Sequence, residues 1–167
     1  MAQAKDVFPN LAAARTLLSA ANTLTFTQVL TGVNLGAGVG MLIDKVQFYP
    51  DNASIGLMAD DSDELMFAIT TSNLLTDLTT MTDRRILLMK RILGNLVGVA
   101  ANFEHYELPF EMSFTPPLIF ASPQLFIAGD STGLAAPMTF DTRLYFRYIT
   151  LTAQEYIELA EQFILLG

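Results

Sequence analysis

The sequence predicts a single mainly-β domain, built as a sandwich or barrel of about eight short strands. Segments in which apolar and polar residues alternate recur along the chain, and most of them end on Pro or Gly. The 167 residues match the usual size of one domain, which is large enough to bury a core without disulfides. The chain contains no cysteine, so disulfides and thiolate metal sites are excluded.

The first clear strand is predicted over residues 23–31, a run of β-favouring threonines and apolar residues. Period-two alternation places Leu24, Phe26 and Leu30 on one face and the threonines on the other. A glycine-rich connection follows, and residues 39–49 are predicted to form the next strand.

Two further strands are predicted in the middle of the chain. Residues 65–71 lie between an acidic run and a Ser-Asn pair, which is typical of a short strand between turns. Residues 84–93 fit either a helix capped by Asp83 or a strand. We favour the strand because the neighbouring segments are strands.

The second half of the chain alternates between apolar runs and turn signals. Strands are expected over residues 108–114 and 119–128, separated by Pro116 and Pro117, with a turn at residues 129–133. Residues 138–151 give the clearest strand, and its length predicts a central, buried element. Its core face is expected to carry Met138, Phe140, Leu144, Phe146 and Tyr148.

A C-terminal amphipathic helix is predicted over residues 152–167. Thr152 and Glu155 have the spacing of a capping box, in which each side chain bonds the backbone of the other. Tyr156 and Phe163 lie on the apolar face, which we expect to pack on the domain or on a neighbouring subunit. Both are therefore interface candidates.

The domain boundaries follow from these elements. Residues 1–22 are expected to form an N-terminal arm or a short helix that starts at the cap residue Asn10. Residues 23–151 form the sandwich, for which the jelly roll fits best, and residues 152–167 form the helix.

Composition and charge indicate self-association. The chain is 51% hydrophobic and 16% charged, and its mean hydropathy is +0.40, so much of its surface is expected to be covered by other copies. Nine Lys and Arg against 17 Asp and Glu give a net charge of −8. That balance argues against direct contact with nucleic acid, which requires clustered cations.

Candidate residues for chemistry are few. His105 is the only histidine, and no nucleophile motif accompanies it, so we predict no catalytic residue, no cofactor and no enzyme activity. The glycines at 36, 38 and 40 lack the spacing of a nucleotide fingerprint and predict a turn. The acidic run Asp60, Asp61, Asp63 and Glu64 is either a solvated turn or a weak calcium site shared between subunits.

One basic cluster stands out. Arg84, Arg85 and Arg91 are interface candidates, because acidic partners are numerous enough to make ion pairs between subunits more plausible than phosphate binding.

The strand succession with Pro and Gly corners, the long strand at residues 138–151 and the acidic tail helix resemble single jelly-roll capsid proteins of small icosahedral viruses. The resemblance is architectural and covers residues 23–151. It implies a structural subunit of an icosahedral shell, located in the virion after assembly in the host cytoplasm. Its partners would be copies of itself and other virion proteins.

The missing basic arm bears on the kind of shell that this resemblance implies. It points to a shell whose genome is handled by other components or lies behind an internal membrane. The alternative function is a carbohydrate- or ligand-binding β-sandwich, against which the absence of Trp counts.

Overall fold

The computed structural model describes residues 3–4, 8–34, 37–51, 53–54, 58, 62–78, 82–94 and 110–164. Helix α2 (Ala153–Ile164) follows the last strand. The described strands are β1 (Gln3–Ala4), β2 (Asn10–Leu17), β3 (Thr25–Leu30), β4 (Val39–Pro50), β5 (Glu64–Thr70), β6 (Ile86–Leu93), β7 (Phe110–Phe120), β8 (Gln124–Thr132) and β9 (Thr139–Thr150).

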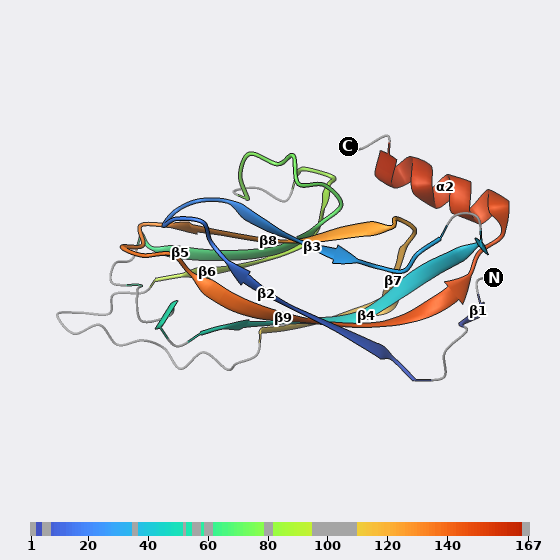
Figure 1. The fold of residues 1–167 in the computed structure, drawn as a ribbon, viewed down its shortest axis with the longest axis horizontal. Helices are drawn as coiled ribbons and strands as arrows, with labels where there is room; N and C mark the ends of the chain where they lie inside the picture. The colour runs from blue at the N-terminus through green and yellow to red at the C-terminus, as the bar shows by residue number, and fades with distance from the viewer. Residues whose placement is uncertain are drawn as a thin grey trace.

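The strands form two antiparallel sheets that face each other (Figure 1). In sheet A, β9 pairs with β4 on one side, and β7 forms the edge of the sheet beyond β4. On its other side β9 pairs with β1 and then β2, which lie one after the other along it and form the opposite edge. Sheet B has the order β3-β8-β5-β6. The pairs β2 with β9, β3 with β8, β4 with β7 and β5 with β6 are nested, as if one long hairpin were wound around a barrel. The fold is a jelly roll.

The core lies between the two sheets and is centred on three phenylalanine rings. Phe67 of β5 lies 4.8 Å from Phe140 of β9 and 5.5 Å from Phe48 of β4, between ring centroids. Leu144 and Phe146 continue the buried row along β9. The prediction that residues 138–151 give a central strand with this face buried is confirmed.

Sheet B is apolar on its outer face as well. Residues 71–78 and 82–85, which lie between β5 and β6 in the chain, run over that face (Figure 1). They enclose a second cluster made of Met66, Ala68, Leu75, Leu78, Ile86 and Ala128. Strand β5 is therefore buried on both sides, which explains its nearly unbroken apolar sequence.

The N-terminal helix expected from Asn10 does not form. Residues 10–17 form strand β2, which pairs with β9 from Asn10 opposite Phe146 to Leu17 opposite Thr139. Alanine-rich sequence favours a helix locally, but pairing with the longest strand of the sheet overrides that weak preference. The jelly roll therefore begins at residue 10, within the segment expected to be an arm or short helix.

The face that carries Leu24, Phe26 and Leu30 lies on the outer side of sheet B. Leu24 and Phe26 pack against the outer cluster of sheet B, and Leu30 is 79% exposed. Val29 packs on the main core, and the hydroxyl of Thr16 donates to that of Thr27 at 2.9 Å. Apolar residues occur on both faces because both faces of sheet B are covered, so alternation alone does not show which face lies between the sheets.

The boundaries of β7 and β8 differ from those expected. Strand β7 continues through Pro116 and Pro117 to Phe120, and β8 continues through the expected turn to Thr132. The register of β7 against β4 shifts where residues 114–117 lie opposite Asp44. Proline is tolerated there because β7 is an edge strand with a bulge at that point.

The remaining elements agree with the sequence. Residues predicted as strands near 39–49, 65–71 and 84–93 form β4, β5 and β6, which settles the last segment as a strand. The glycine segment turns tightly at Gly38, whose φ of 58° suits glycine and whose carbonyl accepts the Leu151 N–H at 2.8 Å. No helix in the described residues is long and apolar enough to cross a membrane.

The capping box forms as predicted. Thr152 Oγ1 accepts the Glu155 N–H at 3.2 Å, and Glu155 Oε2 accepts the Thr152 N–H at 2.9 Å. Tyr156, one turn into α2, is 4% exposed and belongs to the main core. The start of α2 is therefore fixed to its own subunit.

Replacing Thr152 by Ala is expected to destabilise the fold by about 1 kcal/mol, because the Glu155 N–H loses its acceptor, Thr152 Oγ1. Hydrogen bonds from the Thr152 backbone and hydroxyl lower the pKa of Glu155, so this stabilisation is present above about pH 4.3 and is lost as the pH falls further. Urea unfolding at neutral and acidic pH measures both effects. An unchanged midpoint at neutral pH would contradict the role of the box.

Candidate interaction surfaces

The outer face of sheet A carries a polar network centred on Gln47. The side chain of Gln47 donates from Nε2 to Glu111 Oε2 at 2.7 Å. Its Oε1 accepts the hydroxyls of Tyr49 at 3.0 Å and Tyr145 at 3.1 Å. The hydrogen bond from Gln47, followed by that from Lys45, lowers the pKa of Glu111. The network holds two tyrosines and an ionised carboxylate in place across three strands.

Two cations lie over the tyrosine rings of this network. Lys45 Nζ is 4.6 Å from the ring centre of Tyr145 and 3.3 Å from Glu111 Oε2. The Arg143 guanidinium is 5.1 Å from the ring centre of Tyr49. Both contacts are within the range of cation–π attraction. Tyrosine and arginine together are typical of residues that dominate protein interfaces.

The bulge in β4 builds an ion pair beside the network. Asp44 accepts two hydrogen bonds from Arg147, at 3.0 Å from Nε and 2.6 Å from the terminal nitrogen, and these bonds raise the pKa of Arg147. A hollow of about 430 Å³ lies here, lined by Pro9, Asp44, Lys45, Tyr145 and Arg147. Its cations already have acidic partners, so an anion entering it would have to compete with them.

The outer face of sheet A differs in charge from the molecule as a whole. It holds four of the nine Lys and Arg side chains, namely Arg15, Lys45, Arg143 and Arg147. Three acids lie among them: Asp44, Glu111 and Asp141. In a chain with a net charge of −8, the described residues of this face are slightly positive in sum, which makes it suited to contact with negatively charged protein surfaces.

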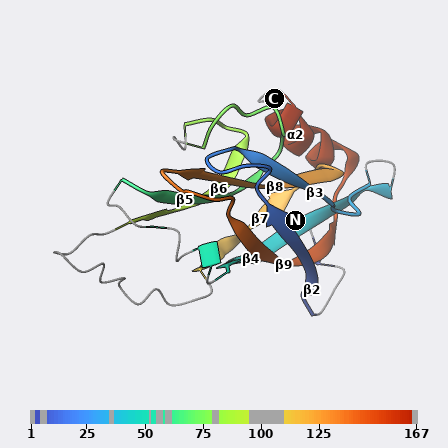
Figure 2. The ribbon, with the colours of Figure 1, turned by 60° about the vertical axis from the view of Figure 1, so that its left-hand side comes forward.

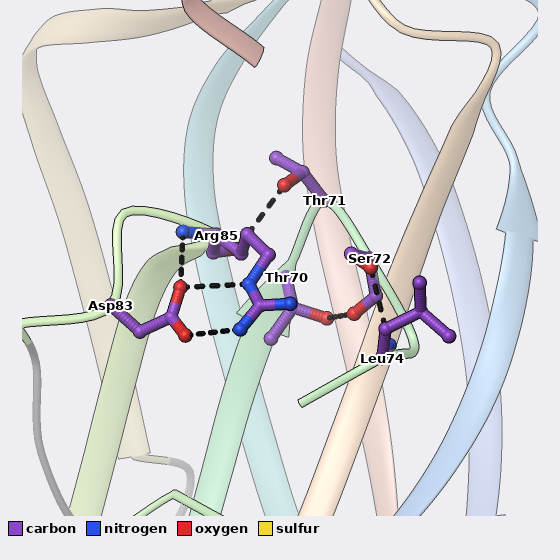
Figure 3. A network of polar contacts seen from close by, with 6 residues as sticks. All are labelled: Thr70, Thr71, Ser72, Leu74, Asp83 and Arg85. Atoms are coloured by element: carbon purple, nitrogen blue, oxygen red, sulfur yellow. Dashed lines mark hydrogen bonds and ion pairs between the residues drawn. The ribbon is translucent and has the colours of Figure 1, made fainter. Parts of the chain in front are cut away.

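A second polar network fixes the ends of the segment that covers sheet B (Figure 3). The Asp83 carboxylate accepts three hydrogen bonds from Arg85, at 2.9 Å from the backbone N–H, 2.9 Å from Nε and 2.6 Å from the terminal nitrogen. These bonds lower the pKa of Asp83 and raise that of Arg85. The Arg85 carbonyl accepts the Thr71 N–H at 2.9 Å, which joins the end of the segment to its start.

The first turn of the same segment is fixed by hydroxyl groups. Thr70 Oγ1 donates to the carbonyl of Ser72 at 2.9 Å, and Ser72 Oγ accepts the N–H of Leu74 at 3.1 Å (Figure 3). Leu74 nevertheless points outward and is 72% exposed. The network therefore holds a large apolar side chain on the surface of sheet B.

Among the carboxyl groups that the structure describes, Asp130 of β8 is the one whose pKa is raised by its surroundings. Burial is the main cause, and the charge of Asp77 on the covering segment adds to it, whereas a hydrogen bond from the Ser131 N–H opposes it. The folded state therefore favours the neutral acid. Stability is lost as the pH rises from about 4 through the folded pKa.

Replacing Asp130 by Asn is expected to raise the midpoint of thermal unfolding at neutral pH, because Asn keeps an acceptor for the Ser131 N–H at 2.8 Å without the charge. The gain should shrink as the pH falls towards about 4. Asp141→Asn is the control, because its carboxylate is exposed on the other sheet and its gain or loss should stay below about 0.5 kcal/mol. Equal gains in both variants would contradict this account.

Comparison with known proteins gives similarity at the level of structure and not of sequence. No protein family and no curated protein matches the sequence. A solved structure described as Desmodium yellow mottle tymovirus is similar over 86% of this chain and 82% of its own, with 11% identity and a TM-score of 0.36. The assignment of the jelly roll rests on the strand order given above.

The predicted interface arginines are mostly neutralised within the subunit. Arg85 is bound to Asp83, and Arg91 donates from Nε to Glu64 at 3.0 Å and pairs with its second oxygen, whereas Arg84 is exposed. Tyr156 lies in the core, as described. The side chain of Phe163 lies outside the described residues.

The calcium candidates are only partly described. Asp63 is 4% exposed, and Glu64 makes the ion pair with Arg91. Asp60, Asp61 and His105 lie outside the described residues, so a shared calcium site stays a prediction. Within the described residues, no three His, Asp or Glu side chains form a group that could hold a metal.

The Gln47 network was missed at the sequence level. Its signal was the outward row of β9, where Asp141, Arg143, Tyr145 and Arg147 alternate with the core residues. Lys45, Gln47 and Tyr49 form a matching row on β4, but only the pairing of the two strands reveals that the rows are adjacent.

Proposed function

We propose that this chain is a structural subunit that associates with copies of itself into a closed, capsid-like shell, and not an enzyme. The observation that supports it best is a set of seven large apolar side chains, among the residues that the structure describes, that are each more than half exposed. They are Phe8, Leu11, Leu17, Leu30, Leu74, Leu93 and Ile157.

Single exposed apolar residues are ordinary, so their placement is what matters. Leu11 and Leu17 share the outward face of β2 on sheet A. Leu30 and Leu74 belong to sheet B and its covering segment. With only 16% charged residues in the chain, these positions provide apolar area that association with other copies would cover.

The net charge of −8 limits how copies can meet, because like charges repel when subunits approach. Apolar and backbone contacts are therefore the proposed driving force. Virion proteins of other kinds are further proposed partners, and the virion is the proposed location. Direct contact with nucleic acid is not part of the proposal, since the cations of the outer face of sheet A are paired with acids or stacked on tyrosines.

The full chain, purified from a heterologous host, tests the proposal by sedimentation and electron microscopy. We expect closed particles many times heavier than the 18.3 kDa chain. Particles should persist in 1 M NaCl, because repulsion is then screened over about 3 Å. A monodisperse 18.3 kDa species at every concentration and salt would overturn the proposal.

A second candidate, a carbohydrate- or ligand-binding sandwich, is supported by the hollow beside Tyr145. An aromatic ring flanked by polar groups is the chemistry that sugar binding requires. A glycan array tests this candidate, with Tyr145→Ala as the control that should abolish any binding.

A further inference from the structure

The sandwich has two flanks, each formed by one edge strand from each sheet. Strands β2 and β3 form one flank, where Thr16 and Thr27 are hydrogen-bonded at 2.9 Å. Strands β7 and β6 form the other, where Lys90 Nζ lies 5.6 Å from the ring centre of Phe110. Edge strands expose unpaired backbone groups, so each flank can in principle pair with another chain.

The β7 and β6 flank carries the features that prevent such pairing. Pro116 and Pro117 lie in β7, together with the register shift against β4. Strand β6 carries two adjacent cations, Lys90 and Arg91. Prolines, bulges and charges are the usual protection of a sheet edge.

The β2 and β3 flank lacks this protection. Strand β3 contains neither a charge nor a proline, and Arg15 is the one charged residue of β2. Leu11 and Leu17 of β2 are 55% and 61% exposed. Figure 2 shows β2 beside β9 at the margin of sheet A, with its N-terminal end reaching away from the sandwich.

We propose that β2 pairs antiparallel with β2 of a second copy of this chain, so that sheet A continues across two molecules. This contact rests on the proposed self-association and names one of its interfaces. It uses backbone hydrogen bonds and apolar side chains, which a chain with a net charge of −8 can bring together without opposite charges.

The alternation along β2 limits the register. Its odd-numbered side chains face outward, and directly opposed residues in a sheet share a face, so odd residues must pair with odd ones. Two symmetric registers then lie near the middle of the strand, with either Ala13 or Ala14 opposite itself. With Ala13 opposite itself, Leu11 lies opposite the partner's Arg15. With Ala14 opposite itself, Leu11 of each copy lies opposite Leu17 of the other, so a leucine pair forms at each end of the contact. We propose this second register.

Disulfide cross-linking tests this register in a chain that has no cysteine of its own. The double variant Leu11→Cys, Leu17→Cys should form covalent dimers under mild oxidation, because directly opposed residues lie within disulfide distance. A bridge within one chain is excluded, since six residues of strand span about 20 Å. Both positions are more than half exposed, so the substitutions should not impair folding.

The single variants Leu11→Cys, Leu17→Cys and Ala13→Cys are the controls and should stay uncross-linked. Cross-linking of Ala13→Cys in place of the double variant would overturn the register. Particles that form without cross-linking of the double variant would overturn β2 pairing and leave self-assembly intact. A wild-type chain that stays monomeric would overturn both.

A charge substitution at Ala13 provides a second measurement without oxidation. In the proposed register Ala13 lies opposite the partner's Arg15, so Ala13→Lys should weaken association by about tenfold and Ala13→Glu should strengthen it. In the other register each new side chain faces its own copy, and both variants would weaken association. Sedimentation equilibrium distinguishes these results, and weakening by Ala13→Glu would overturn the proposal.

Discussion

Replacing Phe140 by Ala is expected to lower the free energy of unfolding by about 3–5 kcal/mol. The ring is 1% exposed and lies between the sheets, 4.8 Å from Phe67 and 6.3 Å from Phe48 between ring centroids. Truncation removes buried apolar surface from both sheets and leaves a cavity that the rigid strands cannot close. Urea unfolding followed by circular dichroism measures the loss.

Phe8→Ala is the matched control, because the same truncation is made at a ring that is 81% exposed. Its effect should stay within about 0.5 kcal/mol. A loss below about 1 kcal/mol for Phe140→Ala would show that this face of β9 is not enclosed between the sheets.

Gly133→Ala is expected to lower the free energy of unfolding by about 3 kcal/mol. Gly133 follows β8 with a φ of 79°, in the left-handed region that residues with a side chain rarely adopt. A methyl group there would also overlap the carboxylate of the buried Asp63. Thermal unfolding of the purified variant measures the combined cost.

A double-mutant cycle separates the two causes. If the overlap contributes, Gly133→Ala should cost less in an Asp63→Ala background than in the wild type. The cost that remains reports the backbone conformation. An identical cost in both backgrounds would mean that the carboxylate moves aside freely.

The sequence predicts an element well where one local signal dominates. The row Phe140, Leu144 and Phe146 identified β9 because its other face is polar, so alternation and burial agree. The capping box identified the start of α2 because both of its hydrogen bonds are local. Neither signal depends on a distant part of the chain.

Prediction failed where a distant segment decides. Residues 10–17 are alanine-rich and look helical, but β9, which lies near the other end of the chain, makes them a strand. Alternation in β3 does not show which of its faces turns inward, because residues 71–78 and 82–85 cover the outer face of sheet B. Strand pairing and coverage by loops are properties of the whole fold that local patterns do not contain.

The candidate surfaces also divide into features that are visible in the local sequence and features that depend on the whole fold. The basic cluster Arg84, Arg85 and Arg91 is visible as a run in the sequence, yet Asp83 and Glu64 neutralise two of its members within the subunit. The cations that share the outer face of sheet A are dispersed from Arg15 to Arg147. Only the sheet order brings them to one surface.

The pairing of β2 with β9 also sets the order in which this chain can fold. Asn10 pairs with Phe146, so the first long strand of sheet A has no partner until the distant strand β9 has left the ribosome. Folding that must close such a large loop is slow, because the chain loses conformational entropy before the contacts between the two strands form and offset that loss. Throughout that interval both edges of β2 lack a native partner, and neighbouring nascent chains compete with β9 for the same strand. Slow synthesis and low temperature should therefore favour soluble protein.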